Sequence, residues 1–69
     1  MKHSYIKICD DVRVSVAEWN EGDIHCQVQF NHFPILYPDW DKVEVMGEYE
    51  LTSPMQVYRL IEDLRKKYE

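Results

Sequence analysis

Residues 12–30 have the sequence VRVSVAEWNEGDIHCQVQF, which holds two alternating segments joined by a turn and decides the fold. Val12, Val14 and Val16 share one side of the first segment, because successive strand residues point to opposite faces of a sheet. The turn at residues 20–22 places glycine last, where a three-residue hairpin loop needs a left-handed backbone. This stretch therefore predicts a β-hairpin.

The turn also sets the register of the hairpin. If Trp19 faces Asp23, counting back predicts these further pairs: Val16 with Cys26, Val14 with Val28, and Val12 with Phe30. The apolar face of the second strand then consists of Ile24, Cys26, Val28 and Phe30. Both strands bury the same face.

Two further alternating segments flank the hairpin. Residues 4–8 place Ile6 and Ile8 on one side, and pairing Ile8 with Val12 leaves a turn at residues 9–11. Residues 42–51 form the fourth predicted strand. One side of it carries Val43, Val45, Gly47, Tyr49 and Leu51, and the other carries Glu44, Met46, Glu48 and Glu50. The second side is an acidic stripe.

A helix follows the fourth strand. Ser53 is the expected N-cap, Pro54 suits the first helical position, and Gln56 completes a capping box. The apolar residues Val57, Leu60, Ile61, Leu64 and Tyr68 recur at helical spacing. The helix should pack this stripe against the sheet.

These elements predict an α+β fold: one domain over residues 1–69, with a four-stranded antiparallel sheet (β-β-β-β-α) and one C-terminal helix on one face. The element order resembles that of the positive-cofactor-four type of single-stranded-DNA-binding module, and the resemblance is one of element order alone. One helix is about 10 Å wide and the sheet roughly 19 Å, so half of the apolar face should need another cover. The only other apolar segment is residues 31–41, NHFPILYPDWD. We expect Phe33, Ile35 and Leu36 to fold inward as a lid, with Tyr37 and Trp40 left more accessible.

The composition of the chain narrows the range of partners and compartments to consider. Thirteen acidic and eight basic residues give a net charge of −5, which opposes nucleic-acid binding on average and favours a basic partner surface. Cys9 and Cys26 lie too far apart in the predicted register to form a disulfide. With no apolar leader at the start, the sequence predicts a cytoplasmic protein.

No pattern in the sequence indicates catalysis, a metal site or a cofactor. His25 and Cys26 are strand neighbours on opposite faces, so they cannot share an ion. No serine or cysteine lies in a glycine-flanked elbow, and Asp10 and Asp11 disfavour a Cys9 thiolate. We therefore expect a protein that is not an enzyme, with no catalytic residues, metal ligands or cofactor.

The favoured hypothesis is a small protein-binding module that inhibits or antagonises a partner by occupying its basic surface, as mobile-element anti-defence or toxin-neutralising proteins do. The predicted partner-binding residues are Tyr37, Asp39, Trp40, Asp41, Glu44, Met46, Glu48 and Glu50. The alternative is a dimeric single-stranded nucleic-acid binder that uses the outer sheet face. Its predicted residues are Tyr5, Lys7, Arg13, Trp19 and His25. A homodimer that pairs uncovered sheet faces or helices is a third possibility.

Overall fold

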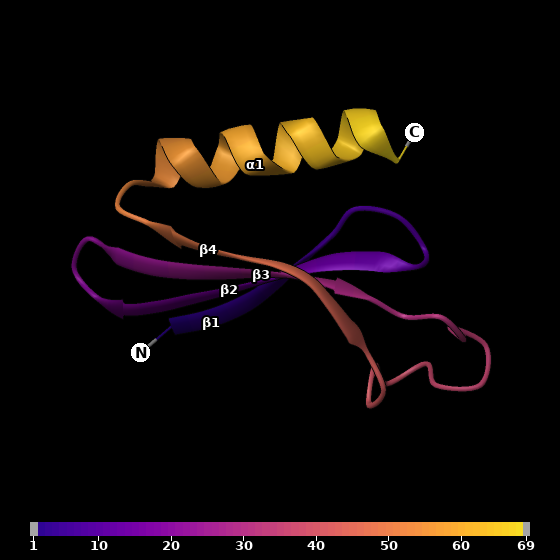
Figure 1. Ribbon diagram of the computed structural model, residues 1–69. Coiled ribbons are helices and arrows are strands. Elements are labelled where there is room, and N and C mark those ends of the chain that lie inside the picture. Colours follow the sequence, from indigo (N-terminus) through magenta and orange to yellow (C-terminus); the bar gives the residue numbers. More distant parts are fainter. Residues whose placement is uncertain (1, 69) are drawn as a thin grey trace.

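The computed structural model describes residues 2–68 and has a four-stranded antiparallel sheet with one helix across one face (Figure 1). The elements are β1 (Lys2–Lys7), β2 (Val12–Asn20), β3 (Asp23–Phe30), β4 (Glu44–Leu51) and α1 (Pro54–Lys67). The strands lie side by side in chain order, each antiparallel to the next. The predicted α+β class and the β-β-β-β-α order are confirmed.

The central hairpin has the predicted register over most of its length. The pairs Val12–Phe30, Val14–Val28 and Val16–Cys26 all form. Gly22 has the expected left-handed backbone, with φ of 89°. The pair predicted next to the turn is wrong, because the ladder shifts between Glu18 and Asn20, so that Asn20 faces Asp23. Trp19 is the residue that this bulge leaves without a partner.

The core lies between the helix and the two central strands. Its buried residues are Val12, Val14, Ile24, Cys26, Val28, Val57, Ile61 and Leu64, and the half-buried Ile6, Ile8, Cys9, Val16, Phe30, Leu51, Leu60 and Tyr68 pack against them. The apolar face and helical stripe predicted from the sequence are thus the ones that meet. Burial is deepest on β2 and β3, and these two neighbouring strands span about the width of one helix.

The fourth strand departs from the predicted alternation. Gly47 faces Val28, but the register then shifts so that Val45 faces Gln29 and Glu44 faces Phe30. Paired residues in neighbouring strands point to the same side of a sheet, so the bulge moves Val45 to the outer face and Glu44 to the helix side. The predicted single acidic stripe is therefore wrong at its Glu44 end.

The helix begins as predicted. Ser53 is the N-cap and Pro54 the first residue, and Gln56 Oε1 accepts hydrogen bonds from the backbone N–H groups of Thr52 at 2.7 Å and Ser53 at 3.3 Å. The last turn carries Arg65, Lys66 and Lys67. These cations suit the negative end of the helix dipole.

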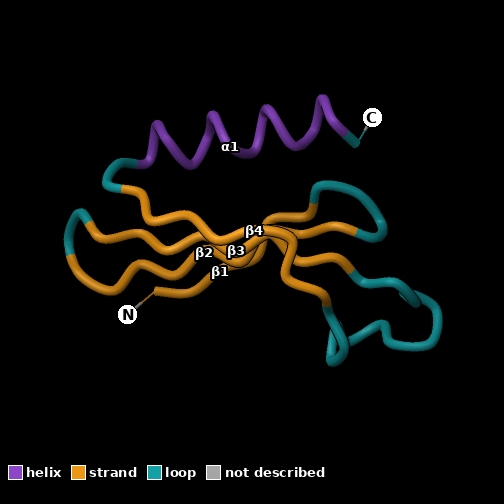
Figure 2. Tube along the Cα trace, viewed as in Figure 1, coloured by secondary structure: helices purple, strands orange, loops and turns teal. Residues whose placement is uncertain are grey.

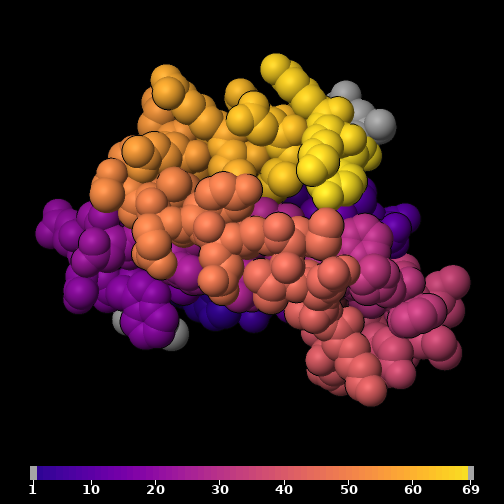
Figure 3. Space-filling model, in the orientation of Figure 1, coloured from indigo at the N-terminus to yellow at the C-terminus, as the bar shows by residue number. Residues whose placement is uncertain are grey.

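The segment between β3 and β4 lies on the side of the sheet away from α1, so the predicted lid is wrong (Figure 2). It protrudes beyond the body of the molecule (Figure 3). The helix already covers the central strands, and on β4 the Tyr49 ring lies over Gly47, where an added Cβ would sit 3.2 Å from Tyr49 Oη. The helix and Tyr49 thus cover the apolar face over the central strands and part of β4, and no residue of the segment between β3 and β4 packs in the core.

Candidate functional site

The loop of residues 31–43 is built around Asn31, which is fully buried. Its backbone N–H donates to Asp11 O at 2.7 Å and so extends the β2–β3 ladder by one residue. Its side chain donates from Nδ2 to Tyr37 O at 2.8 Å and accepts from the Phe33 N–H at 3.0 Å. These two bonds fold the loop back on itself. The Tyr37 N–H also donates to Phe33 O at 2.8 Å.

A stack of three side chains fastens the far end of this loop to the outer sheet face. The Arg13 guanidinium carbon lies 3.9 Å from the ring centroid of Tyr5 and 4.7 Å from that of Trp40. Arg13 Nε also donates to Gln29 Oε1 at 2.7 Å. Trp40 holds a left-handed backbone, with φ of 60°, which is costly for a bulky residue. The stack stabilises that conformation and fixes the direction in which the chain leaves the loop.

This bracing leaves the apolar tip of the loop in solvent. Ile35 is 94% exposed, Leu36 72% and Phe33 58%. Tyr37 and Trp40 are instead half-buried. The predicted order of accessibility is therefore reversed, because Arg13 holds the Trp40 ring against the sheet and Asn31 bonds the Tyr37 backbone within the loop.

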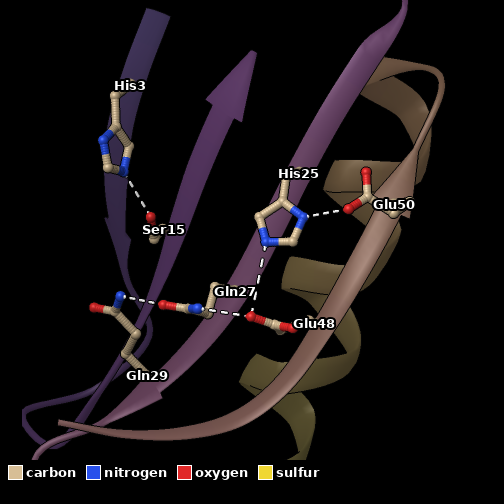
Figure 4. Close-up of polar contacts among 7 residues, drawn as sticks. All are labelled: His3, Ser15, His25, Gln27, Gln29, Glu48 and Glu50. Atoms are coloured by element: carbon tan, nitrogen blue, oxygen red, sulfur yellow. Dashed lines mark hydrogen bonds and ion pairs between the residues drawn. The ribbon is translucent and has the colours of Figure 1, made fainter. Parts of the chain in front are cut away.

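A polar ladder covers the outer sheet face beside the loop (Figure 4). Gln29 Nε2 donates to Gln27 Oε1 at 2.7 Å, and Gln27 Nε2 donates to Glu48 Oε1 at 2.9 Å. His25 Nδ1 lies 2.5 Å from Glu50 Oε1, while His3 Nε2 and Ser15 Oγ share a hydrogen bond of 2.6 Å. Together with the Arg13–Gln29 bond, which joins β2 to β3, these contacts involve side chains of all four strands.

The predicted partner-binding residues do not form one surface. Asp39 and Asp41 are exposed on the loop, next to its apolar tip in sequence. Glu48 and Glu50 are exposed on the outer face but already accept hydrogen bonds from Gln27 and His25.

The other two predicted residues of β4 lie apart from that group. Glu44 lies on the helix side, where its Oε2 is 2.6 Å from His32 Nε2. Met46 lies at the bulge and is about half exposed.

The predicted nucleic-acid residues do share the outer face, but most have partners within the chain. Lys7 Nζ lies 3.2 Å from Asp10 Oδ1, Arg13 is held in its stack, and His25 contacts the carboxylates of β4. Tyr5 is 53% exposed and Trp19 60%. Only these two rings are accessible for stacking, and Arg13 already covers one face of Tyr5.

A shallow hollow of about 530 Å³ separates the loop from the sheet edge. It is lined by Tyr5, Lys7, Asp10, Asp11, Arg13, Pro34, Ile35, Pro38 and Trp40. Its charged residues have both signs. Among residues 2–68 no group of three or more histidine, cysteine or acidic side chains is arranged to hold a metal ion.

Cys9 and Cys26 are both free thiols. Burial, with a smaller contribution from the Glu50 carboxylate, raises the pKa of Cys26. The thiolate form that nucleophilic chemistry requires is therefore disfavoured there. No helix in the described part of the chain is long and apolar enough to cross a membrane.

The residues that sequence reasoning assigned wrongly are those of the loop tip and its anchor. Phe33, Ile35 and Leu36 were expected in the core, and Asn31 was not singled out. One signal was present: an Asn directly after a strand commonly bonds the backbone two residues on, as Asn31 does with the Phe33 N–H.

No protein-family model matches this chain, and neither the curated proteins nor the solved structures compared with it include a match.

Proposed function

We propose that this chain is a non-enzymatic protein-binding module that docks on a basic partner surface through the loop of residues 31–43. One observation carries the proposal. The loop is braced internally and against the sheet, yet it presents Phe33, Ile35 and Leu36 to solvent. Large apolar side chains held outward by a pre-ordered frame suit an interface, because little conformational entropy is lost on binding.

Charge supports the type of partner. The loop carries Asp39 and Asp41 as exposed carboxylates, and the whole chain has a net charge of −5. Carboxylates on the same loop as an apolar tip suit a protein interface, in which charge guides the approach and apolar contact supplies the affinity. The expected partner surface is an apolar pocket rimmed by Lys or Arg.

The biological role that we propose is inhibition or antagonism of the partner in the cytoplasm. Occupying a basic surface blocks whatever else that surface binds, and no catalytic group is needed. Anti-defence and toxin-neutralising proteins of mobile elements work in this manner and are the first systems to test.

The nucleic-acid alternative has weaker support. Lys7 and Arg13 would have to leave Asp10 and the aromatic stack to meet a phosphate backbone. The outer face also carries the Glu48 and Glu50 carboxylates, which repel phosphate.

The test compares two equally conservative surface changes. Leu36→Ser alters the loop tip, and Met55→Ser alters a similarly exposed apolar residue on α1, on the other side of the sheet. Proteins captured from cells that encode the chain would be quantified for the wild type and both variants, and each binary complex would be remade from purified components. We expect a partner whose affinity falls at least tenfold with Leu36→Ser and is unchanged with Met55→Ser.

Salt and nucleic acid provide the opposing outcomes. Raising NaCl from 50 to 500 mM should slow association of the purified complex by roughly tenfold, because opposite charges steer it. The proposal fails if every captured protein binds Leu36→Ser and wild type alike. It also fails if the purified chain binds single-stranded oligonucleotides tightly and loses that binding with Lys7→Ala.

A further inference from the structure

Strand β1 is an open edge of the sheet. It spans Lys2–Lys7 and pairs with β2 on one side only. Among residues 2–68, no loop or helix makes a backbone hydrogen bond to its other side. An unpaired edge is a template for another strand.

The hydrogen bonds show which residues of β1 are available. The Ile8 N–H donates to Val12 O at 2.9 Å, so Ile8 and Val12 occupy a hydrogen-bonded position. Such positions alternate in an antiparallel pair, so every second residue back from Ile8 bonds β2. The backbone groups of His3, Tyr5 and Lys7 therefore point away from the sheet. The bond from the Asn31 N–H to Asp11 O agrees with this alternation. It shows that the odd-numbered residues of the second strand direct their backbone groups toward β3, which leaves the even-numbered ones to bond β1.

The two edges of the sheet, β1 and β4, differ in how well they are protected against pairing with another strand. β4 has a bulge near Met46, and Glu48 and Glu50 project from its outer face. Bulges and charged side chains are the usual devices that stop edge pairing. β1 has a regular six-residue ladder with β2, with no bulge and no proline, and its two lysines, Lys2 and Lys7, lie only at its ends.

A mainly apolar groove lies between the sheet and the start of α1, and Ile6 of β1 is at its margin. It has a volume of about 190 Å³, and Ile6, Val16 and Tyr58 are among its lining residues. Ile6 and Val16 belong to the apolar face and yet remain partly exposed, while Tyr58 is 62% exposed. The core is therefore incompletely covered on the β1 side.

We propose that β1 pairs antiparallel with β1 of a second copy of the chain, about a two-fold axis at Tyr5. In this register Tyr5 meets Tyr5 of the second copy, and His3 meets Lys7 of the second copy. The outward-directed backbone groups of His3, Tyr5 and Lys7 in each copy are then all paired, which gives about six backbone hydrogen bonds between the copies. No lysine faces a lysine.

A second copy suits the edge because β1 itself supplies an apolar side chain, the partly exposed Ile6, for the groove beside it. On the helix side, Ser4 of one copy faces Ile6 of the other, so an apolar side chain enters each groove. A chain of 69 residues buries only about 60% of its unfolded surface, and small domains commonly gain stability from a partner subunit.

The dimer would have a consequence for binding. An axis perpendicular to the sheet keeps both helices on one face and both 31–43 loops on the other. Two docking loops on one face allow bivalent attachment, with avidity well above that of one loop. This consequence depends on the proposed function, whereas the β1 pairing does not.

The test uses two substitutions at one residue. Tyr5→Ala and Tyr5→Pro both remove the ring from the Arg13 stack, but only Tyr5→Pro also removes the outward N–H. Neither touches a hydrogen bond to β2. Light scattering and sedimentation equilibrium from 10 µM to 1 mM would give the mass, against 8.4 kDa for one chain. We expect twice that mass for wild type and Tyr5→Ala, and a dimer at least a hundredfold weaker for Tyr5→Pro.

Hydrogen exchange provides a second measurement that needs no variant. The His3, Tyr5 and Lys7 amides should exchange slowly in concentrated wild-type protein and faster on dilution, while the Ile6 amide should not change. A wild-type monomer throughout the range overturns the proposal, as does a dimer that is equally strong in Tyr5→Pro. Leu36→Ser should remain dimeric, so failure of the loop hypothesis and failure of the pairing give different results.

Discussion

Replacing Asn31 with alanine should loosen the 31–43 loop while leaving the sheet and helix in place. The substitution removes the donor to Tyr37 O and the acceptor for the Phe33 N–H, at a position with no solvent exposure. It retains the backbone bond from residue 31 to Asp11 O. The substitution therefore removes only the two side-chain hydrogen bonds within the loop.

The expected cost follows from the two lost bonds. Each contributes about 1 kcal/mol net, and leaving the Phe33 N–H without its partner costs about 1–3 kcal/mol, whereas Tyr37 O still accepts from the Trp40 N–H at 3.1 Å. Water can reach the opened loop and offset part of that penalty, so we expect a loss of about 2–3 kcal/mol in the free energy of unfolding. A chain of this length has roughly 3–10 kcal/mol in total. The variant should remain folded but with much less stability.

Asn31→Asp makes the prediction more specific. It retains the acceptor for the Phe33 N–H but replaces the donor to Tyr37 O with a carboxylate oxygen, which repels that carbonyl. At neutral pH the loss should equal or exceed that of Asn31→Ala. Burial favours the neutral carboxyl, which can donate, so the added cost is absent at acid pH and appears as pH rises above about 4.

Urea unfolding monitored by circular dichroism and tryptophan fluorescence measures these losses. With a slope of about 1 kcal/mol per molar urea, the midpoint for Asn31→Ala should fall by about 2–3 M. Asn20→Ala, at an exposed position in the β2–β3 hairpin, is the matched control and should shift the midpoint little. An Asn31→Ala midpoint within 0.5 M of wild type would refute the view that Asn31 organises the loop.

Three other predictions concern the stack, the turn and the thiols. Arg13→Lys should cost about 1–2 kcal/mol and alter the near-ultraviolet circular dichroism of Trp40, because a lysine has no planar group that can contact both rings while it donates to Gln29; an unchanged spectrum would contradict this. Gly22→Ala should lower unfolding stability by about 1 kcal/mol through backbone strain alone, since nothing lies within 4 Å of the added Cβ, and Gly22→Asn should cost less in the same urea assay. At pH 8 an aromatic disulfide reagent should modify the partly exposed Cys9 in the folded protein and Cys26 only on unfolding, since Cys26 is fully buried and its pKa is raised; equal rates would contradict its placement in the core.

Periodicity predicted the parts of this fold that depend on alternation. The pairing of Val12 with Phe30 and the apolar stripe of α1 follow from side chains that must share one buried face. The Gly22 turn was equally predictable from the sequence, because few residue types tolerate its left-handed backbone. The bulges near Trp19 and Met46 were not predictable, since alternation on each side of a bulge looks regular in the sequence.

The direction of the 31–43 loop could not be predicted either. Its apolar residues suggested a lid, because burial of Ile35 and Leu36 is favourable wherever an open apolar face exists. The direction depends instead on contacts between residues distant in sequence. Asn31 continues the ladder to Asp11, and Arg13 on the outer face holds Trp40 between the loop and the sheet.

The β4 bulge connects this fold to the proposed docking surface. By turning Glu44 to the helix side beside His32, it removes one carboxylate from the outer face. Glu48 and Glu50 remain there but are bonded to Gln27 and His25. Asp39 and Asp41 are exposed on the same loop as the apolar tip, so the charge that steers a basic partner and the side chains that contact it belong to one loop. A partner should therefore respond to changes in that loop far more than to changes along β4.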